Sequence, residues 1–316
     1  MSTSRQGNPV EVMREHGPEL RREGRERLPA EGDGFDEFME TRVTDVLTGN
    51  PGYDVAVVGE EGTEEIEGES PDYVVLVDPV DGSSAAYNDG RGFCTTGLAV
   101  LDDIEITENG VSGRPIGSYV IQLGGRGTEL SSWRGEPQID GEVRFTDVSP
   151  EDDVPGTVEG TRIGPAQIES LEDLGPERGF AAVYAAKEGR SEVDECFLGP
   201  LSEENPDLRK DVWGGSMNDA RVGYGANIVA GEPIPTRATE IAGDTFAQAM
   251  GAVSRDVYGE ENEVVYVAMR DGEPAKTFNS VVTPNKEVME DVMNTVDVGG
   301  LERAFPEYFE TYNEVT

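Results

Sequence analysis

The chain has 316 residues, which suffices for about two domains of ordinary size or for one large layered domain. Its 25 basic and 65 acidic residues give a net charge of −40, and such a surface repels the phosphates of nucleic acids and anionic membranes. With 36% hydrophobic residues and 40 glycines, the composition is that of a globular protein and excludes a disordered acidic chain. We therefore expect no nucleic-acid or membrane partner.

The basic residues are almost all arginines. The four lysines are Lys187, Lys210, Lys276 and Lys286. Few lysines among many carboxylates are typical of halophilic proteins, because molar salt shortens the range of charge repulsion to about 3 Å while the carboxylates keep the surface hydrated. The composition thus predicts a halophilic, haloarchaeal protein, with an acidic protein of an ordinary cytoplasm as the alternative.

The rarity of cysteine and histidine limits the chemistry. Cys94 and Cys196 are far apart and His16 is the only histidine, which excludes zinc sites of the Cys/His type and a histidine-based catalytic triad. A metal site in this chain must use oxygen ligands, which suit Mg²⁺, Mn²⁺ or Ca²⁺. The sequence has no apolar run of about 18 residues and no hydrophobic signal segment, so we expect a soluble, cytoplasmic protein.

The predicted elements alternate along the chain. Helices are expected over residues 9–28 and, from an apolar stripe with helical spacing, from Gly34 to Leu47. Short apolar, β-branched runs predict strands over residues 55–58, 73–77, 96–101, 116–121 and 143–145. Residues 147–179 are rich in Asp, Glu, Pro and Gly and mark the expected domain boundary. Beyond it we expect strands over 180–184 and 264–268 and helices over 216–230, 239–250 and 285–296. This alternation favours an α/β layered fold.

Two of these strands end at carboxylates. The strand 73–77 leads into Asp78-Pro79-Val80-Asp81, and the strand 55–58 leads into Gly59-Glu60-Glu61. Acids at neighbouring strand ends can converge on one or two divalent ions. Gly82 then allows a close backbone approach, and the amides of Ser83 and Ser84 are placed to bind a phosphate at a turn. The sequence thus predicts adjacent metal and phosphate sites.

This segment resembles the superfamily of magnesium-dependent, lithium-sensitive phosphatases that contains inositol monophosphatases and fructose-1,6-bisphosphatases. That family carries a Glu-Glu pair, then Asp-Pro-Ile/Leu-Asp-Gly-Thr/Ser, then a strand, which here matches residues 93–100. The resemblance covers residues 57–100. It implies an alternating α-β-α-β-α sandwich of the sugar phosphatase type, with a metal- and phosphate-binding half over 1–148 and a half over 149–316 that completes the substrate pocket.

The resemblance also implies the site. Glu60, Asp78, Asp81 and the carbonyl of Val80 correspond to ligands of two or three Mg²⁺ ions, with Mn²⁺ as an alternative metal. Ser83 corresponds to the residue that positions the attacking water. Glu61 is expected to form a salt bridge or to support the ligands.

For two further acids of the site, the sequence pattern leaves more than one residue as a candidate. The inositol branch of the family closes its site with Trp-Asp, which does not occur after Trp213, whereas the bisphosphatase branch uses Glu, and Glu240 fits that helix. Asp244, one turn later, is the competing assignment. The acid upstream that supports the water is expected to be Asp36, with Asp33 and Glu37 as rivals.

The implied reaction is hydrolysis of a sugar or polyol phosphate by direct attack of water, without a covalent enzyme intermediate. Ser83-Ser84 and Glu240 favour fructose-1,6-bisphosphate, whose second phosphate needs cations such as Arg221 and Arg237. Inositol-1-phosphate is the alternative, followed by a nucleotide-derived 3′-phosphate and by an inactive, metal-dependent regulatory protein. The expected assembly is a homodimer or homotetramer.

Overall fold

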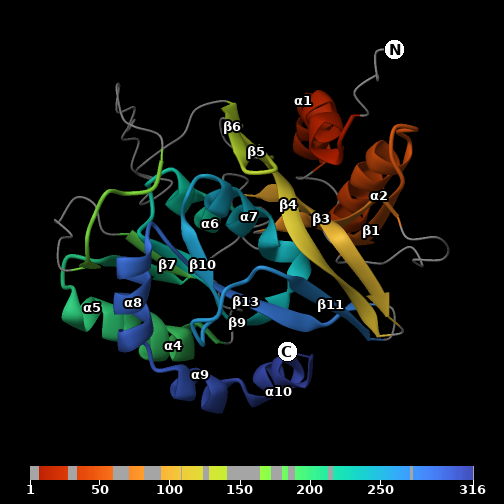
Figure 1. The fold of residues 1–316 in the computed structure, drawn as a ribbon. Coiled ribbons are helices and arrows are strands. Elements are labelled where there is room, and N and C mark those ends of the chain that lie inside the picture. The colour runs from red at the N-terminus through yellow and green to blue at the C-terminus, as the bar shows by residue number, and fades with distance from the viewer. Residues whose placement is uncertain are drawn as a thin grey trace.

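The computed structural model describes residues 7–27, 34–59, 71–81, 94–107, 109–123, 128–140, 164–171, 180–183, 189–212, 216–270 and 273–315. Within these residues the chain forms two β-sheets and three layers of helices (Figure 1).

The first sheet contains eight strands within the described residues. Its main order is β1 (Val55–Gly59), β2 (Tyr73–Asp81), β3 (Thr95–Thr107), β4 (Gly110–Gln122), β11 (Val265–Arg270) and β12 (Glu273–Pro274). β5 (Glu129–Trp133) and β6 (Glu136–Asp140) form a hairpin, and β5 pairs with the second half of β4. β1 and β2 are parallel, and the other pairs are antiparallel.

From Val74 to Val77, β2 is apolar and buried on both faces. Val75 and Val77 pack toward the helices on the outer face, whereas Val74 and Leu76 pack into the cluster on the inner face. A strand buried on both faces has no polar positions until it ends, so its first carboxylates occur at the exit of the strand.

The second sheet has the order β10 (Val253–Arg255), β13 (Lys276–Thr283), β9 (Val229–Arg237), β7 (Phe180–Val183) and β8 (Arg209–Val212). β7 is parallel to β8 and β9, and β13 is antiparallel to β9 and β10. Because β11 belongs to the first sheet and β13 to the second, the carboxy-terminal part of the chain contributes to both sheets.

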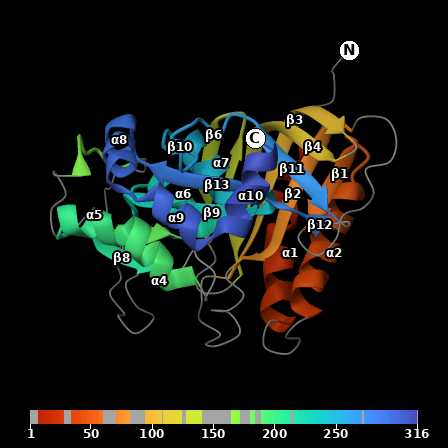
Figure 2. The same ribbon diagram turned by 90° about the horizontal axis from the view of Figure 1, so that it is seen from below.

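Helices cover both outer faces and fill the space between the sheets (Figures 1 and 2). The outer face of the first sheet carries α1 (Pro9–Arg27) and α2 (Phe35–Thr48). Between the sheets lie α6 (Ser216–Gly223), the 3₁₀ turn η5 (Ala238–Ile241) and α7 (Ala242–Ala249). The outer layer of the second sheet contains α4 (Arg190–Val193), the π turn η4 (Asp194–Leu198), α5 (Gly199–Glu204), α8 (Lys286–Thr295), α9 (Val298–Ala304) and α10 (Pro306–Val315). The predicted α-β-α-β-α sandwich is confirmed.

Most predicted elements are present, with one clear correction. The expected stripe of α2 is buried through Phe35, Met39, Val43 and Leu47. The helix predicted over 216–230 is wrong in its second half, since α6 ends at Gly223 and β9 begins at Val229. Gly225, with φ +82°, turns the chain between them, a conformation that favours glycine. The strand expected at 143–145 and the division at residue 148 lie outside the described residues.

Within the described part of the chain, no helix combines the length and apolar character that crossing a membrane requires.

Candidate functional site

The exit of β2 forms the first part of the candidate site. Asp78 and Asp81 are buried, with 2% and 8% of their surface exposed. Asp78 pairs with Gly97 of β3 and Asp81 with Thr95, so three steps on β2 face two steps on β3. The resulting bulge is held by local hydrogen bonds: the Val80 amide donates to Asp78 Oδ1 (3.2 Å). Both carboxylates are thereby fixed on a strand rather than on a free loop.

An acid of α2 lies near the exit of β2 as well. Burial, together with the carboxylates of Asp81, Asp78 and Asp36, raises the pKa of the Cys94 thiol. These three acids therefore surround one buried cysteine, although Asp36 is more than 40 residues upstream. Its rival Glu37 is exposed on the same helix, and Asp33 lies outside the described residues.

Glu40, one turn after Asp36 on α2, reaches the end of β1. A Cβ atom built on Gly59 would overlap the Glu40 carboxylate, so that carboxylate lies directly against the backbone of β1. Gly59 is the last residue before Glu60, and only a glycine permits this approach. α2 thus presents two carboxylates to the ends of β1 and β2.

A second set of acids comes from the layer between the sheets. Burial, followed by the carboxylates of Asp244, Asp81 and Glu240, raises the pKa of Asp219 on α6 well above its ordinary value. Burial and then Glu240, with contributions from Asp219 and Asp81, likewise raise the pKa of Glu232 on β9. Asp81 acts on residues of both sets. The acids at the exit of β2 and those of α6, β9 and η5 therefore form one cluster.

Glu240 and Asp244 lie in different surroundings. Glu240 is half-buried and its Oε1 accepts a hydrogen bond of 2.6 Å from the Thr236 hydroxyl. Asp244 is fully buried, and its two oxygens accept hydrogen bonds from Gln248 Nε2 (2.8 Å) and Ser254 Oγ (2.7 Å). Burial raises the pKa of Asp244 to about 6, and both hydrogen bonds oppose that rise. Asp244 is thus bound into the protein interior by its own neighbours.

Sequence reasoning did not identify Asp219 and Glu232. Each is an isolated acid in a segment otherwise suited to burial, and each is nearly inaccessible, with 3% and 2% of its surface exposed. Neither oxygen of Glu232 has a donor among the described residues. A lone carboxylate in an apolar run is the sequence signal for such a residue, but in a chain with 65 acids that signal is weak.

The remaining predicted residues are placed as follows. Val80 is buried between the two aspartates of β2, and Arg221 is buried on α6 with 4% exposure. Arg237 is half-buried at the end of β9, in register with Lys276 of β13. Glu60, Gly82, Ser83 and Ser84 lie outside the described residues.

The chemistry of the acid cluster suits a hard cation. Its candidate ligands are carboxylate and carbonyl oxygens, and Glu232 brings two buried oxygens that lack donors. Clustered buried carboxylates need positive charge or protons to offset their repulsion. Among the described residues no three Asp, Glu, His or Cys side chains are arranged to hold one ion. Glu60, the further ligand predicted from the sequence, lies outside the described residues.

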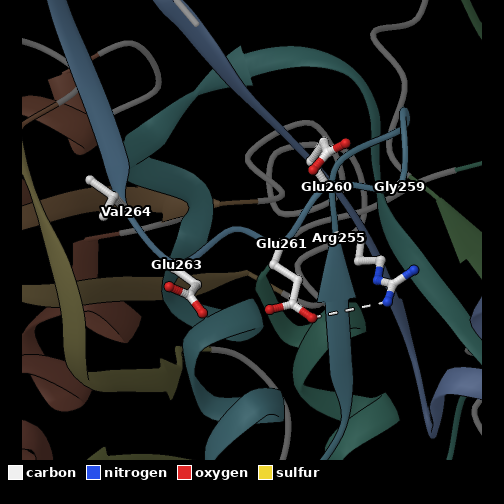
Figure 3. Close-up of a pocket in the computed structure, with 6 residues that line it drawn as sticks. All are labelled: Arg255, Gly259, Glu260, Glu261, Glu263 and Val264. Atoms are coloured by element: carbon white, nitrogen blue, oxygen red, sulfur yellow. Dashed lines mark ion pairs between the residues drawn. The ribbon is translucent and has the colours of Figure 1, made fainter.

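A separate pocket of about 530 Å³ lies between the end of β10 and the start of β11 (Figure 3). It is lined by Arg255, Gly259, Glu260, Glu261, Glu263 and Val264. Arg255 Nη2 and Glu261 Oε1 are 4.0 Å apart, and the three glutamates are exposed. None of the predicted site residues lines this open, acidic pocket, so the candidate site remains the buried acid cluster.

Comparison with known proteins identifies the fold. No protein-family model and no curated protein sequence matches the chain. Inositol monophosphatase II from Staphylococcus aureus is similar with a TM-score of 0.60 and 13% identity, over 95% of this chain and 98% of that one. The extragenic suppressor protein SuhB from Bartonella henselae has a TM-score of 0.62 and 14% identity, over 92% and 98%. A hypothetical protein from Pyrococcus horikoshii with similarities to inositol-1 monophosphatase has a TM-score of 0.58 and 16% identity, over 91% and 99%.

The chain therefore has the fold of the inositol monophosphatases. Structures of the staphylococcal enzyme contain bound inositol monophosphate and bound 2′-AMP. At these low identities the similarity establishes the fold alone.

Proposed function

We propose that the protein is a metal-dependent phosphomonoesterase that hydrolyses a sugar or polyol phosphate. The observation that carries the proposal is that two sets of buried and half-buried acids share Asp81, one with Asp36 and Asp78 and the other with Asp219, Glu232, Glu240 and, beside Asp219, Asp244. Such a concentration of buried carboxylates destabilises a fold and is retained where it serves a site. The inositol monophosphatase fold supports the same conclusion.

Asp78, Asp81 and Glu240, with the Val80 carbonyl and Glu60, are the residues proposed to hold the metal. Bound Mg²⁺ supplies a Lewis acid that stabilises phosphoryl charge and lowers the pKa of water. The protein's own part is to orient its carboxylates, to exclude bulk water and to accept the proton of the attacking water through Ser83 and Asp36.

Water is the proposed nucleophile, since neither Cys94 nor His16 is suited to that role. Burial and the nearby carboxylates raise the pKa of Cys94, so its thiol is protonated at neutral pH and is a poor nucleophile. His16 is exposed on α1 and is the only histidine of the chain. A direct displacement at phosphorus requires neither residue.

Glu240 is proposed as the late metal ligand in preference to Asp244. Both acids act on Asp219, but Glu240 also acts on Glu232, whereas Asp244 has both oxygens engaged by Gln248 and Ser254. We expect Glu240→Gln to slow hydrolysis of sugar phosphates more than that of an activated aryl phosphate, since poor leaving groups depend most on charge stabilisation. The same leaving-group dependence in Asp244→Asn, with Glu240→Gln behaving as wild type, contradicts this assignment.

For the substrate we retain fructose-1,6-bisphosphate, with Arg237 near Glu240 and Arg221 as candidate cations for the second phosphate. Inositol-1-phosphate is the alternative, favoured by the inositol monophosphate found in a protein of the same fold. A 3′-phosphorylated nucleotide is a third candidate. Discrimination among these substrates depends on groups that match the second phosphate or the ring hydroxyls.

A panel assay tests these assignments. Phosphate release from the three substrates is measured with and without Mg²⁺, in 0.1 M and 2 M KCl, with Asp81→Asn as the inactive control. Mg²⁺-dependent release by the wild type supports the proposal, and the substrate with the highest kcat/KM identifies the branch. Release from none of them, by a folded protein, favours the regulatory alternative.

The acidity of the chain also bears on its stability in salt. A net charge of −40 with four lysines leaves little internal pairing, so we propose that the folded, active protein requires molar KCl. The proposed assembly is a homodimer or homotetramer. Equal thermal midpoints at 0.1 M and 2 M KCl contradict the halophilic interpretation.

A further inference from the structure

Three buried threonine hydroxyls each bind a group of the candidate site. Thr236 Oγ1 donates to Glu240 Oε1 (2.6 Å), Thr95 Oγ1 to Asp81 Oδ2 (3.4 Å) and Thr96 Oγ1 to the carbonyl of Pro79 (2.8 Å). All three threonines are at most 4% exposed. They come from the start of β3 and the end of β9, the strands that adjoin the two sets of acids.

Thr95 and Thr236 each donate a hydrogen bond to a carboxylate, and the bond from Thr236 is the stronger one. An O–H···O⁻ distance of 2.6 Å belongs to the short, charge-assisted class, whereas the 3.4 Å contact of Thr95 is long for a hydroxyl donor. Threonine is branched at Cβ, which restricts its χ1 angle and fixes the direction of the donor. Thr236 therefore holds its acceptor in a defined place.

The position of this bond gives it a specific effect. Thr236 lies on β9 and Glu240 on η5, so the bond spans the corner between the second sheet and the layer of α6 and α7. Glu240 is half-buried, so its flexible side chain can turn toward solvent as well as toward Glu232 and Asp219. A hydroxyl anchored on the strand opposes that rotation.

We propose that Thr236 is a positioning residue that holds the Glu240 carboxylate in the orientation required for metal binding. This inference rests on the proposed function. Residues that orient a metal ligand typically change metal affinity or activity by about 10- to 100-fold when they are removed. A single neutral hydroxyl should fall at the lower end of that range, with Thr95 contributing less because its contact is longer.

The test compares Thr236→Val, which removes the hydroxyl and keeps the shape, with Thr236→Ser, which keeps the hydroxyl. Thr277→Val is the matched control, because the buried Thr277 hydroxyl donates to the Tyr266 carbonyl (2.7 Å) and not to a carboxylate of the described residues. Mn²⁺ affinity, measured by electron paramagnetic resonance without substrate, is the readout that does not depend on turnover. The Mg²⁺ concentration for half-maximal activity is the second readout.

We expect Thr236→Val to weaken Mn²⁺ binding about tenfold and to raise the half-maximal Mg²⁺ concentration in parallel. Thr236→Ser and Thr277→Val should both retain wild-type affinity. In a Glu240→Ala background, Thr236→Val should have no further effect, because its acceptor is gone.

The outcomes separate the inference from the function on which it rests. Wild-type Mn²⁺ affinity in Thr236→Val, in an enzyme that needs Mg²⁺ and loses activity in Asp81→Asn, overturns the positioning role alone. So does an equal loss in Thr236→Ser, or an undiminished effect in the Glu240→Ala background, which remains informative if Thr236→Val folds poorly by itself. A wild-type protein that binds no Mn²⁺ and releases no phosphate overturns the proposed function.

Discussion

Two kinds of buried carboxylate can be compared among the described residues, and they differ in their hydrogen-bond donors. Asp244 accepts from Gln248 and Ser254. Asp256 accepts from the amides of Tyr258 and Glu260 at one oxygen and from the Tyr312 hydroxyl (2.7 Å) at the other. Glu232 is equally buried, but neither of its oxygens has a donor within the described residues, and its nearest charges are other acids.

We expect this difference to separate structural acids from functional ones. A buried carboxylate with donors at both oxygens recovers much of its lost hydration, whereas one without donors retains the penalty of burial. Removing an acid of the first kind should destabilise the fold and preserve activity. Removing one of the second kind should do the reverse, so the comparison can be tested by measuring stability and turnover in the same variants.

The largest effect is expected for Asp81→Asn, and equally for Asp78→Asn. Either change removes an anionic ligand from the proposed cation and should lower kcat by roughly two to three orders of magnitude at saturating Mg²⁺. In metal-free protein the thermal midpoint should stay the same or rise, because repulsion within the cluster is relieved. The measurement is phosphate release combined with thermal unfolding in EDTA.

Asp256→Asn is the matched control for these variants. It replaces a buried acid that has three donors, so we expect a lower thermal midpoint with nearly normal kcat. Near-normal turnover in Asp81→Asn instead indicates that the β2 bulge is a structural turn and that the catalytic site lies elsewhere.

The second prediction concerns the pH dependence of stability through Asp244. Its folded-state pKa of about 6 exceeds the ordinary value of 3.8, so between these values the folded state holds a proton that the unfolded state has lost. The stabilisation is complete below about pH 3.8 and is lost as the pH rises toward 6, a change of up to about 3 kcal/mol. The free energy of unfolding of Asp244→Asn relative to wild type should therefore rise over this window. A difference independent of pH contradicts the burial of this acid.

A smaller loss of stability is expected for Tyr312→Phe. The Tyr312 hydroxyl on α10 donates to the buried Asp256, and its loss leaves one carboxylate oxygen without that donor. We expect the free energy of unfolding to fall by about 1.5–3 kcal/mol, as measured by chemical denaturation in KCl, with unchanged kcat. Tyr308→Phe on the same helix is the control, since its ring contacts Lys276 and Phe305. Equal losses in the two variants would show that the bond to Asp256 contributes little.

The fold was predictable where local pattern and final burial agree. The apolar residues of α2 have helical spacing, and those of β2 form a short continuous run. In the fold both sets of side chains are buried, as these patterns predict. β9 was not predicted, since it contains Gly231, Pro233 and Pro235, which argue against a central strand. It nevertheless lies between β13 and β7, and shifts of register against β13 accommodate it. The place of β9 in the sheet is therefore explained by its pairing with β13 and not by its own sequence.

The same reasoning applies to the candidate site. Asp78 and Asp81 follow directly from a strand that ends in acids, and the structure places Asp36 and Glu240 near them. Asp219 and Glu232 become site candidates only when α6 packs against β9 and α7, a contact that the local sequence pattern does not predict. In a chain with 65 acids, burial rather than residue type distinguishes them, and burial is a property of the folded molecule.

The smallest effect, and the one that tests the comparison most directly, is expected for Glu232→Gln. Burial and the neighbouring acids raise the pKa of Glu232, so ionisation at neutral pH opposes folding, and a neutral side chain of the same shape removes that penalty. The free energy of unfolding of metal-free protein should rise by roughly 1 kcal/mol at pH 7. Because a raised pKa affects stability only above the unfolded-state value of 4.5, the gain should vanish at lower pH. Turnover should fall, because Glu232 adjoins Glu240. A loss of stability at pH 7 instead means that Glu232 has donors of its own and belongs with Asp244 and Asp256, and the division of the buried acids into two kinds then fails.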